Sequence, residues 1–278
     1  MTGKPVTVIL LAAQRAGVVN PLAARAGVSH KCLVPICGRP LIDHVLDTLS
    51  TIPEVGEIHV SLEPEAHEAV ERIFDAYRER GPRFDLVPND RNIIASVLAA
   101  AKARAGPFVI TTADNVLLTA DGFAQMVAAL DGADAVIGVA RRKSVLAAHP
   151  EGQRNSYKLR DGEYANCNIY ALSGHDAFAA TELFRKGGQF QAKPGRLMRA
   201  IGPWNIVLYL LRRATMEEAF QRIGARFGVK ARVVTFADGS LAIDVDNERT
   251  YACCEAILKQ REAVAGGIKI LLPGKAGR

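Results

Sequence analysis

Apolar runs and helix-like stretches alternate regularly over residues 6–114, and this alternation restricts the chain to few classes of fold. Short runs rich in β-branched residues alternate with stretches whose apolar positions recur at helical spacing. The predicted strands are VTVILLAA, EIHVSL, FDLVP and PFVITTAD, and the predicted helices between them are RPLIDHVLDTLS, EAHEAVERIFDAYRER and IIASVLAAAKARA. This order predicts an α/β fold, in which a doubly wound parallel sheet carries helices on both faces.

The pattern changes after residue 135, so the second half does not repeat the first. DAVIGVARR is a further predicted strand, and RDGE separates two alternating runs in SYKLRDGEYANCNIYAL as a hairpin turn would, which makes the sheet mixed. A basic, helix-rich insertion is predicted at about 175–228, followed by strands ARVVTF and SLAIDVD and the helix ERTYACCEAILKQREAV. We therefore expect a single domain over residues 1–265 and a tail over 266–278.

Composition narrows the class of protein. Hydrophobic residues make up 49% of the 278 residues, which excludes global disorder. Lys and Arg outnumber Asp and Glu by 35 to 29, but no dense basic run or aromatic-basic motif favours nucleic acid, so anionic small molecules are the better partners. The N-terminal apolar run is too short for a membrane span and lacks a clear cleavage site. Five cysteines with neither disulfide nor zinc spacing predict reduced thiols in the cytoplasm.

The first strand runs into a loop of small residues with a basic residue downstream. Backbone N–H groups of such a loop, together with a positive charge, form a site for a polyphosphate. The candidate nucleotide-binding residues are Leu11, Ala12, Ala13, Gln14, Arg15 and Lys31. The alternative is a compact turn with Lys31 as a solvated surface charge.

These residues resemble a known family. The stretch LAAQRAGVVNPLAARAGVSHKCLVPICGRPLI is similar to the opening L-A-A-G-x-G-[ST]-R of the MobA-like and sugar-phosphate nucleotidyltransferases, with its later lysine and G-[KR]-P-[LM] step. The resemblance implies a Rossmann-like, GT-A-like fold and a loop that wraps the NTP phosphates, with Lys31 as a catalytic residue that neutralises them. In this chain Gln14 and Ala16 replace the two glycines, and His30 replaces the proline before the lysine.

Two acidic residues resemble the metal ligands of that family. Asp114 ends the run FVITTAD, and Asp246 lies in LAIDVDNERT, which resembles the late segment [DN]-[VI]-[DN]-T-P-E-D. Carboxylates are the hard oxygen ligands that Mg²⁺ prefers. The resemblance therefore implies that Asp114 and Asp246 are catalytic and hold Mg²⁺, with Asp244 two residues earlier. The alternative for Asp114 is a helix or turn cap, and Asn247 and Glu248 could equally cap the next helix.

Further resemblances concern the two substrates. NDRNIIASVLAAAKA is similar to a segment that lines the nucleobase pocket, which implies a contact from Ser96, although its hydroxyl could equally satisfy backbone donors. EYANCNIYAL is similar to a strand that contacts the acceptor, which implies a role for Asn168 rather than that of a buried structural amide. Lys193 and Arg196 are candidate ligands of an acceptor phosphate, or else belong to a solvated helix face or a homodimer contact.

The implied reaction is Mg²⁺-dependent attack by an acceptor phosphate oxygen on the α-phosphorus of an NTP, with release of pyrophosphate. Such a reaction needs no protein nucleophile, which agrees with the lack of a convincing Ser/His/Asp or Cys/His set. Two alternatives are left open. One is a GT-A-like glycosyltransferase, and the other is a catalytically weakened nucleotide-binding regulatory protein, suggested by Gln14 and Ala16.

Overall fold

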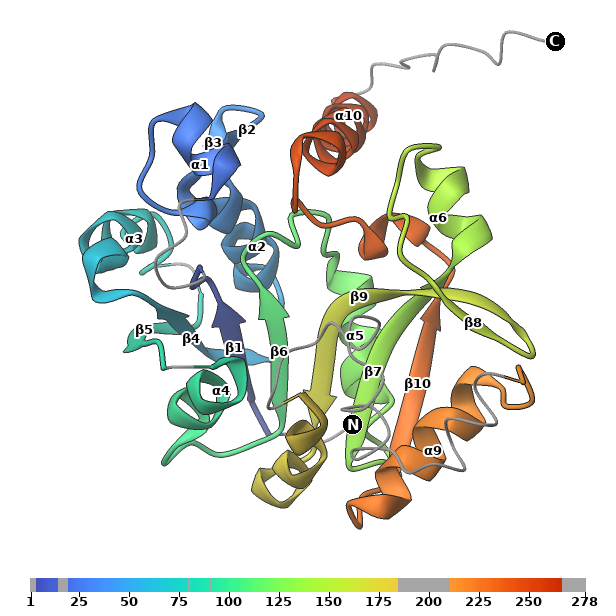
Figure 1. Ribbon diagram of the computed structural model, residues 1–278. Coiled ribbons are helices and arrows are strands. Elements are labelled where there is room, and N and C mark those ends of the chain that lie inside the picture. The colour runs from blue at the N-terminus through green and yellow to red at the C-terminus, as the bar shows by residue number, and fades with distance from the viewer. Residues whose placement is uncertain (1–3, 15–19, 80, 91, 185–210, 267–278) are drawn as a thin grey trace, which may run out of the picture.

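One mixed β-sheet forms the centre of the molecule (Figure 1). The computed structural model describes residues 4–14, 20–79, 81–90, 92–184 and 211–266. Within these residues the strand order is β10-β7-β9-β6-β1-β4-β5, and β8 pairs with β9 alone. The strands are β1 (Val6–Leu11), β4 (Val55–Leu62), β5 (Arg83–Pro88), β6 (Phe108–Thr112), β7 (Ala135–Arg141), β8 (Tyr157–Leu159), β9 (Gly162–Leu172) and β10 (Ala231–Phe236). β9 runs antiparallel to both β6 and β7, whereas β1 is parallel to β4 and β6.

Helices cover both faces of this sheet because successive strand residues point to opposite sides. Val8 and Leu10 of β1 join the large core that includes α2 (Leu41–Ser50), α3 (His67–Phe74) and α5 (Ala120–Ala128). Ile9 joins the core beneath α4 (Ile93–Ala101) and η3 (His175–Phe184). Helix α9 (Met216–Arg226) packs on β10. The predicted doubly wound α/β fold is confirmed.

Several short elements and one long helix gather beyond the carboxyl ends of β1 and β6 (Figure 1). The long helix is α10 (Glu248–Ala265), and the N-terminal elements beside it are α1 (Pro21–Ala26), η1 (Lys31–Leu33), β2 (Pro35–Ile36) and β3 (Arg39–Pro40). Tyr251 of α10 donates a hydrogen bond to the Pro35 carbonyl at 2.8 Å, and Arg25 forms an ion pair with Glu248. Helix α10 therefore contacts the segment that follows β1, beyond the carboxyl ends of β1 and β6.

The strand and helix order of the first half agrees with the sequence prediction. The hairpin is also confirmed, because β8 pairs antiparallel with β9 and Leu159 lies opposite Gly162 across the turn. Two helices that the sequence analysis did not single out, α5 and α6 (Arg142–Ala148), complete the core. The described parts of the predicted insertion are the helical elements η3 and α9, whereas the tail beyond residue 266 lies outside the described residues.

The prediction of a strand over SLAIDVD is wrong. The segment begins as the short 3-10 helix η5 (Gly239–Ala242) and continues to Asp246 without pairing in the sheet. A Cβ on Gly239 would lie 2.1 Å from the Ser144 carbonyl carbon, so this backbone packs directly on that of α6. The apolar side chains of the segment are buried by this packing rather than by strand pairing.

All five cysteines lie within the described residues, and all five are free thiols, in agreement with the sequence prediction. Burial raises the pKa of the Cys254 thiol, which donates to the Ile243 carbonyl at 3.4 Å. Among the described residues, no helix combines the length and the apolar character that crossing a bilayer requires.

Candidate active site

Asp114 lies two residues beyond the end of β6, where the sheet meets the N-terminal elements. The Thr112 hydroxyl donates to its Oδ1 at 2.5 Å and fixes the carboxylate at the sheet edge. The Asp114 carbonyl also accepts a hydrogen bond from the Val245 backbone N–H at 3.1 Å. That single backbone contact brings the segment before α10 beside the end of β6.

Asp246 immediately precedes the N-terminus of α10 and is held by that helix's cap. The Asn247 side chain accepts from the backbone N–H groups of Arg249 and Thr250, as in a capping box. The buried Thr250 hydroxyl accepts from the Asp246 N–H at 2.9 Å and from the Asn247 N–H at 3.2 Å. Asn247 therefore does cap the helix, and the cap fixes the backbone of Asp246.

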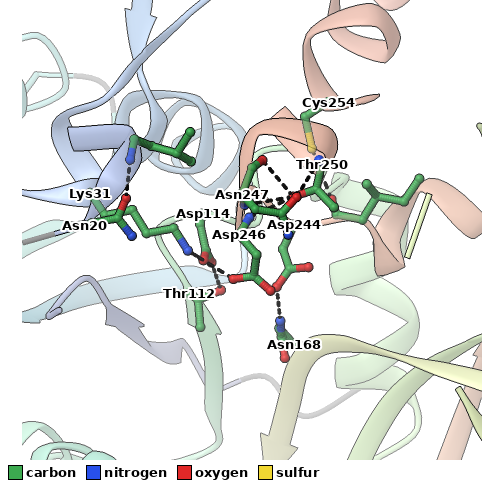
Figure 2. A network of polar contacts seen from close by, with 12 residues as sticks. Asn20, Lys31, Thr112, Asp114, Asn168, Asp244, Asp246, Asn247, Thr250 and Cys254 are labelled. Atoms are coloured by element: carbon green, nitrogen blue, oxygen red, sulfur yellow. Dashed lines mark hydrogen bonds and ion pairs between the residues drawn. The ribbon is translucent and has the colours of Figure 1, made fainter. Parts of the chain in front are cut away.

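Asp114, Asp244 and Asp246 bring carboxylate oxygens within 4.8 Å of one another (Figure 2). Asp244 is only 7% exposed, and burial, followed by repulsion from Asp114 and Asp246, raises the pKa of its carboxyl group well above the usual range. Asp114 and Asp246, the two metal ligands expected from the sequence, lie together in the structure. Asp244, two residues before Asp246, was not among the expected ligands, and the structure adds its carboxylate to the cluster.

Lys31, the first residue of η1, lies against this cluster (Figure 2). Its ammonium group forms an ion pair with Asp114 and a second one with Asp246 at 3.2 Å, and its side chain is 19% exposed. Burial alone would lower the pKa of Lys31, but the charges of Asp114 and Asp246 and the hydrogen bond to Asp114 raise it above its usual value. Lys31 is therefore not a solvated surface charge.

The donor set suits a hard divalent cation. When all three carboxyl groups are ionised, they and the Lys31 ammonium carry a formal charge of −2, which one divalent ion neutralises. Carboxylate oxygens are the ligands that Mg²⁺ accepts, commonly with substrate phosphates completing its shell. The residues present thus fit the metal that the sequence resemblance implies.

The loop after β1 is held by an acidic residue. Leu11 ends β1, and Ala12 donates its N–H to the Ser61 carbonyl at 2.9 Å. The Gln14 N–H donates to Glu63 Oε1 at 3.0 Å, and the Gln14 side-chain amide donates to the Ser29 carbonyl at 3.2 Å. The loop thus reaches Gln14 in a fixed conformation, while Ala13 is exposed and Arg15 lies outside the described residues.

Glu63 also contacts the other segments around this loop. His30 Nε2 lies 3.6 Å from its Oε2, and the Asn89 amide donates to its Oε1 at 3.3 Å. Gln14 and His30, which replace a glycine and a proline of the family motif, therefore contact the same carboxylate. Both replacements therefore connect their segments to Glu63, the residue that follows β4.

Ser96 is buried in the first turns of α4 and accepts a hydrogen bond from the Asp90 N–H at 2.8 Å. The hydroxyl thus orders the segment between β5 and α4, which is the local role named above as the alternative. A contact between Ser96 and a nucleobase stays a prediction.

Asn168 lies on β9 where the register with β7 shifts between Ile137 and Val139. Its backbone has a φ of 49°, and its side-chain amide donates to Asp244 Oδ2 at 2.7 Å (Figure 2). Asn168 therefore faces the acidic cluster, and its expected contact with the acceptor stays a prediction. The other two acceptor candidates, Lys193 and Arg196, lie outside the described residues.

Comparison with known proteins places the chain in a family. Residues 8–220 match the MobA-like NTP transferase domain. The chain belongs to the MobA-like NTP transferases. It is thus an enzyme of the nucleotidyltransferase class, and the family match covers the β1 loop, Lys31 and Asp114 but ends before Asp244. No curated protein sequence matches the chain.

Solved structures share the fold of this NTP transferase. A hypothetical transferase from Thermus thermophilus superposes with a TM-score of 0.71 at 22% identity, covering 89% of this chain and 99% of the other. A 4-diphosphocytidyl-2C-methyl-D-erythritol synthase from Anaerococcus prevotii gives 0.59 at 16% identity, covering 92% and 97%. A CMP:2-keto-3-deoxy-manno-octonic acid synthetase complexed with CTP gives 0.56 at 14% identity, covering 93% and 99%.

Proposed function

We propose that this NTP transferase joins an NTP to a phosphorylated small-molecule acceptor in a Mg²⁺-dependent reaction that releases pyrophosphate. The observation that carries the proposal is the meeting of Asp114, Asp244, Asp246 and Lys31 beside the loop that follows β1. An anionic cluster with one ammonium fits a reaction in which a cation and a lysine neutralise phosphate charge.

The chemistry is a displacement at phosphorus. An acceptor phosphate oxygen forms a bond to the α-phosphorus of the NTP, and the bond from that phosphorus to the β-phosphate bridging oxygen breaks, so pyrophosphate leaves. A bound Mg²⁺ supplies charge neutralisation at the phosphates. Asp114 and Asp246 hold the ion, Lys31 offsets phosphate charge, and the loop from Leu11 to Gln14 orients the nucleotide.

A cytidine nucleotide is the first NTP to test. One structural neighbour carries CTP, and another is named a diphosphocytidyl-methylerythritol synthase. At 14% and 16% identity they share the fold, so the base preference of this chain is a proposal of ours. The experiment crosses four NTPs with sugar, polyol and amino-alcohol phosphates and measures pyrophosphate release.

The carboxylates give the sharpest test of this function. Asp114→Asn and Asp246→Asn should each lower kcat by about 100-fold or more, because each removes a carboxylate that would hold the cation, and the cation neutralises charge in the transition state. Asp131→Asn, an exposed aspartate after α5, serves as the matched control and should leave kcat unchanged. Full metal-dependent turnover in both amide variants would remove these residues from the site.

The two alternative functions give different results in the same assay. A glycosyltransferase would release a nucleotide rather than pyrophosphate from its donor. A weakened regulatory protein would bind nucleotide without turnover. This outcome is worth testing because the Gln14 N–H donates to Glu63 and is therefore not free to donate to a phosphate. Chelation by EDTA should abolish pyrophosphate release if the proposed reaction is correct.

The remaining substrate assignments are proposals too. Ser96 is proposed to face the nucleobase, and Lys193 and Arg196 to bind the acceptor phosphate. Charge removal at Lys193 or Arg196 should raise the KM of the acceptor more than that of the NTP. The single domain over residues 1–265, a homodimer and a cytoplasmic location also stay predictions.

A further inference from the structure

Both oxygens of the buried Asp244 carboxylate face side-chain amides. Asn168 Nδ2 donates to Oδ2 at 2.7 Å, and Gln153 Nε2 donates to Oδ1 at 3.4 Å. Asn168 comes from β9 and Gln153 from the segment between α6 and β8, so two separate parts of the fold converge on one carboxylate. Neutral donors favour the ionised form of a carboxylate and fix the direction of its lone pairs.

The orientation of the Asn168 amide is fixed by a second asparagine. Asn166 Nδ2 donates to Asn168 Oδ1 at 2.9 Å, and Asn166 Oδ1 accepts from the Asn168 backbone N–H at 3.2 Å. The same Asn166 Nδ2 lies 2.7 Å from the hydroxyl of Tyr170. Because Asn168 Oδ1 is occupied as an acceptor, the NH₂ group is the end of the side chain that faces Asp244.

The backbone of Asn168 is shaped for this contact. Its φ of 49° lies in the left-handed region, which is unfavourable for most non-glycine residues. It coincides with the register shift between β9 and β7, and such a bulge re-aims a side chain. Asparagine tolerates this conformation better than most residues, so the strand keeps a polar side chain directed at Asp244.

The identity of the neighbours explains why Asp244 needs this support. Asp114 and Asp246 bring two more carboxylates within 4.8 Å, and Lys31 forms its ion pairs with those two rather than with Asp244. Within the described part of the chain Asp244 forms no ion pair, and a buried carboxylate without a direct cationic partner is unfavourable unless a cation compensates it. We propose that Asp244 is a third carboxylate ligand of the divalent cation, and that Asn168 is the positioning residue that holds it.

This inference rests on the proposed metal site but assigns Asn168 differently from the sequence resemblance. A residue that contacts the acceptor would change the KM of the acceptor when removed. A positioning residue for a metal ligand would instead change the affinity for the cation, even when no substrate is present. The outer partners of metal ligands typically contribute 10- to 100-fold to metal affinity.

The test is a titration of the full-length protein with Mn²⁺ in the absence of nucleotide and acceptor. Electron paramagnetic resonance measures the fraction of Mn²⁺ that is bound. Asn168→Gly removes the amide and suits the positive φ, so the bulge is kept. We expect Asn168→Gly to weaken Mn²⁺ binding by about 10- to 100-fold, and Asp244→Asn to weaken it at least as much. Gln153→Ala should weaken it less, because the contact of Gln153 with Asp244 is longer than that of Asn168. The control is Asn155→Ala, which changes an exposed asparagine in the same segment as Gln153 and should leave Mn²⁺ binding as in the wild type.

Three outcomes separate the possibilities. Weaker Mn²⁺ binding by Asn168→Gly at an unchanged Tm supports the positioning role. Unchanged binding by Asn168→Gly and Asp244→Asn, with weaker binding by Asp114→Asn, overturns the inference and leaves the proposed function intact. Absence of Mn²⁺ binding by the wild-type protein overturns both.

Discussion

At the residue scale, Lys31 has a second role beside that proposed for the nucleotide. Its ammonium pairs with Asp114 and Asp246, so Lys31→Met removes the positive partner of both carboxylates, which lie beside that of Asp244. We expect this variant to lose about 1–3 kcal/mol of unfolding free energy in the metal-free state. The loss should be smaller than that from breaking a fully buried ion pair, because the Asp246 side chain is 52% exposed. Urea unfolding in EDTA measures this. Lys259→Met, which breaks an exposed pair with Glu255, is the control and should change stability by less than about 0.5 kcal/mol.

An equal loss in the two variants would mean that the pairs of Lys31 are no stronger than a surface pair. The sequence indicated Lys31, Asp114 and Asp246 because each lies in a short motif. It did not indicate the role of Asn168 toward Asp244, because that contact depends on a bulge and on the left-handed φ of one residue. Neither feature leaves a periodic signal that a sequence pattern reveals.

At the element scale, the N-terminal cap of α10 connects helix stability to the site. The Thr250 hydroxyl accepts the N–H of Asp246, so Thr250→Val removes this contact and leaves only the Asp244 carbonyl, at 3.0 Å, as an acceptor for that N–H. We expect a loss of about 1–2 kcal/mol in unfolding free energy and a lower kcat, because Asp246 loses its fixed position. Thr250→Ser keeps the hydroxyl and should recover most of both quantities. If valine and serine behaved alike in thermal unfolding and in turnover, the hydroxyl contact would not matter.

The elements of the first half were predictable because hydrophobic periodicity reports a buried face directly. The segment SLAIDVD shows where that argument fails. Its short apolar run followed by Asp and Val is typical of a buried strand, yet the run is buried by packing on α6, and Gly239 allows a backbone contact that a side chain at this position would prevent. A short apolar run indicates burial but does not show whether the backbone pairs with a sheet.

At the scale of the whole molecule, the site joins two parts of the chain. Lys31 and Asp114 come from the N-terminal part, whereas Asp244 and Asp246 come from the segment that leads into α10. Strand direction explains this meeting. β10 is parallel to β7, and β9 is antiparallel to both β7 and β6, so β10 and β6 end on the same side of the sheet. The family match ends at residue 220, before Asp244 and Asp246, so only the late sequence motif indicated Asp246 as a ligand.

A divalent cation that bridges these parts should stabilise the entire fold. A ligand that binds only the folded state at 100 times its Kd contributes about 2.7 kcal/mol, which corresponds to a rise in Tm of roughly 5 °C or more for a chain of this size. We expect this rise on addition of Mg²⁺ or Mn²⁺ to EDTA-treated protein in differential scanning calorimetry. It should disappear in the double variant Asp114→Asn/Asp246→Asn and persist in Asp131→Asn, whose carboxylate is exposed and outside the cluster. An equal rise in the double variant would show that the cation acts elsewhere, and the carboxylates would then not link the two parts through a metal.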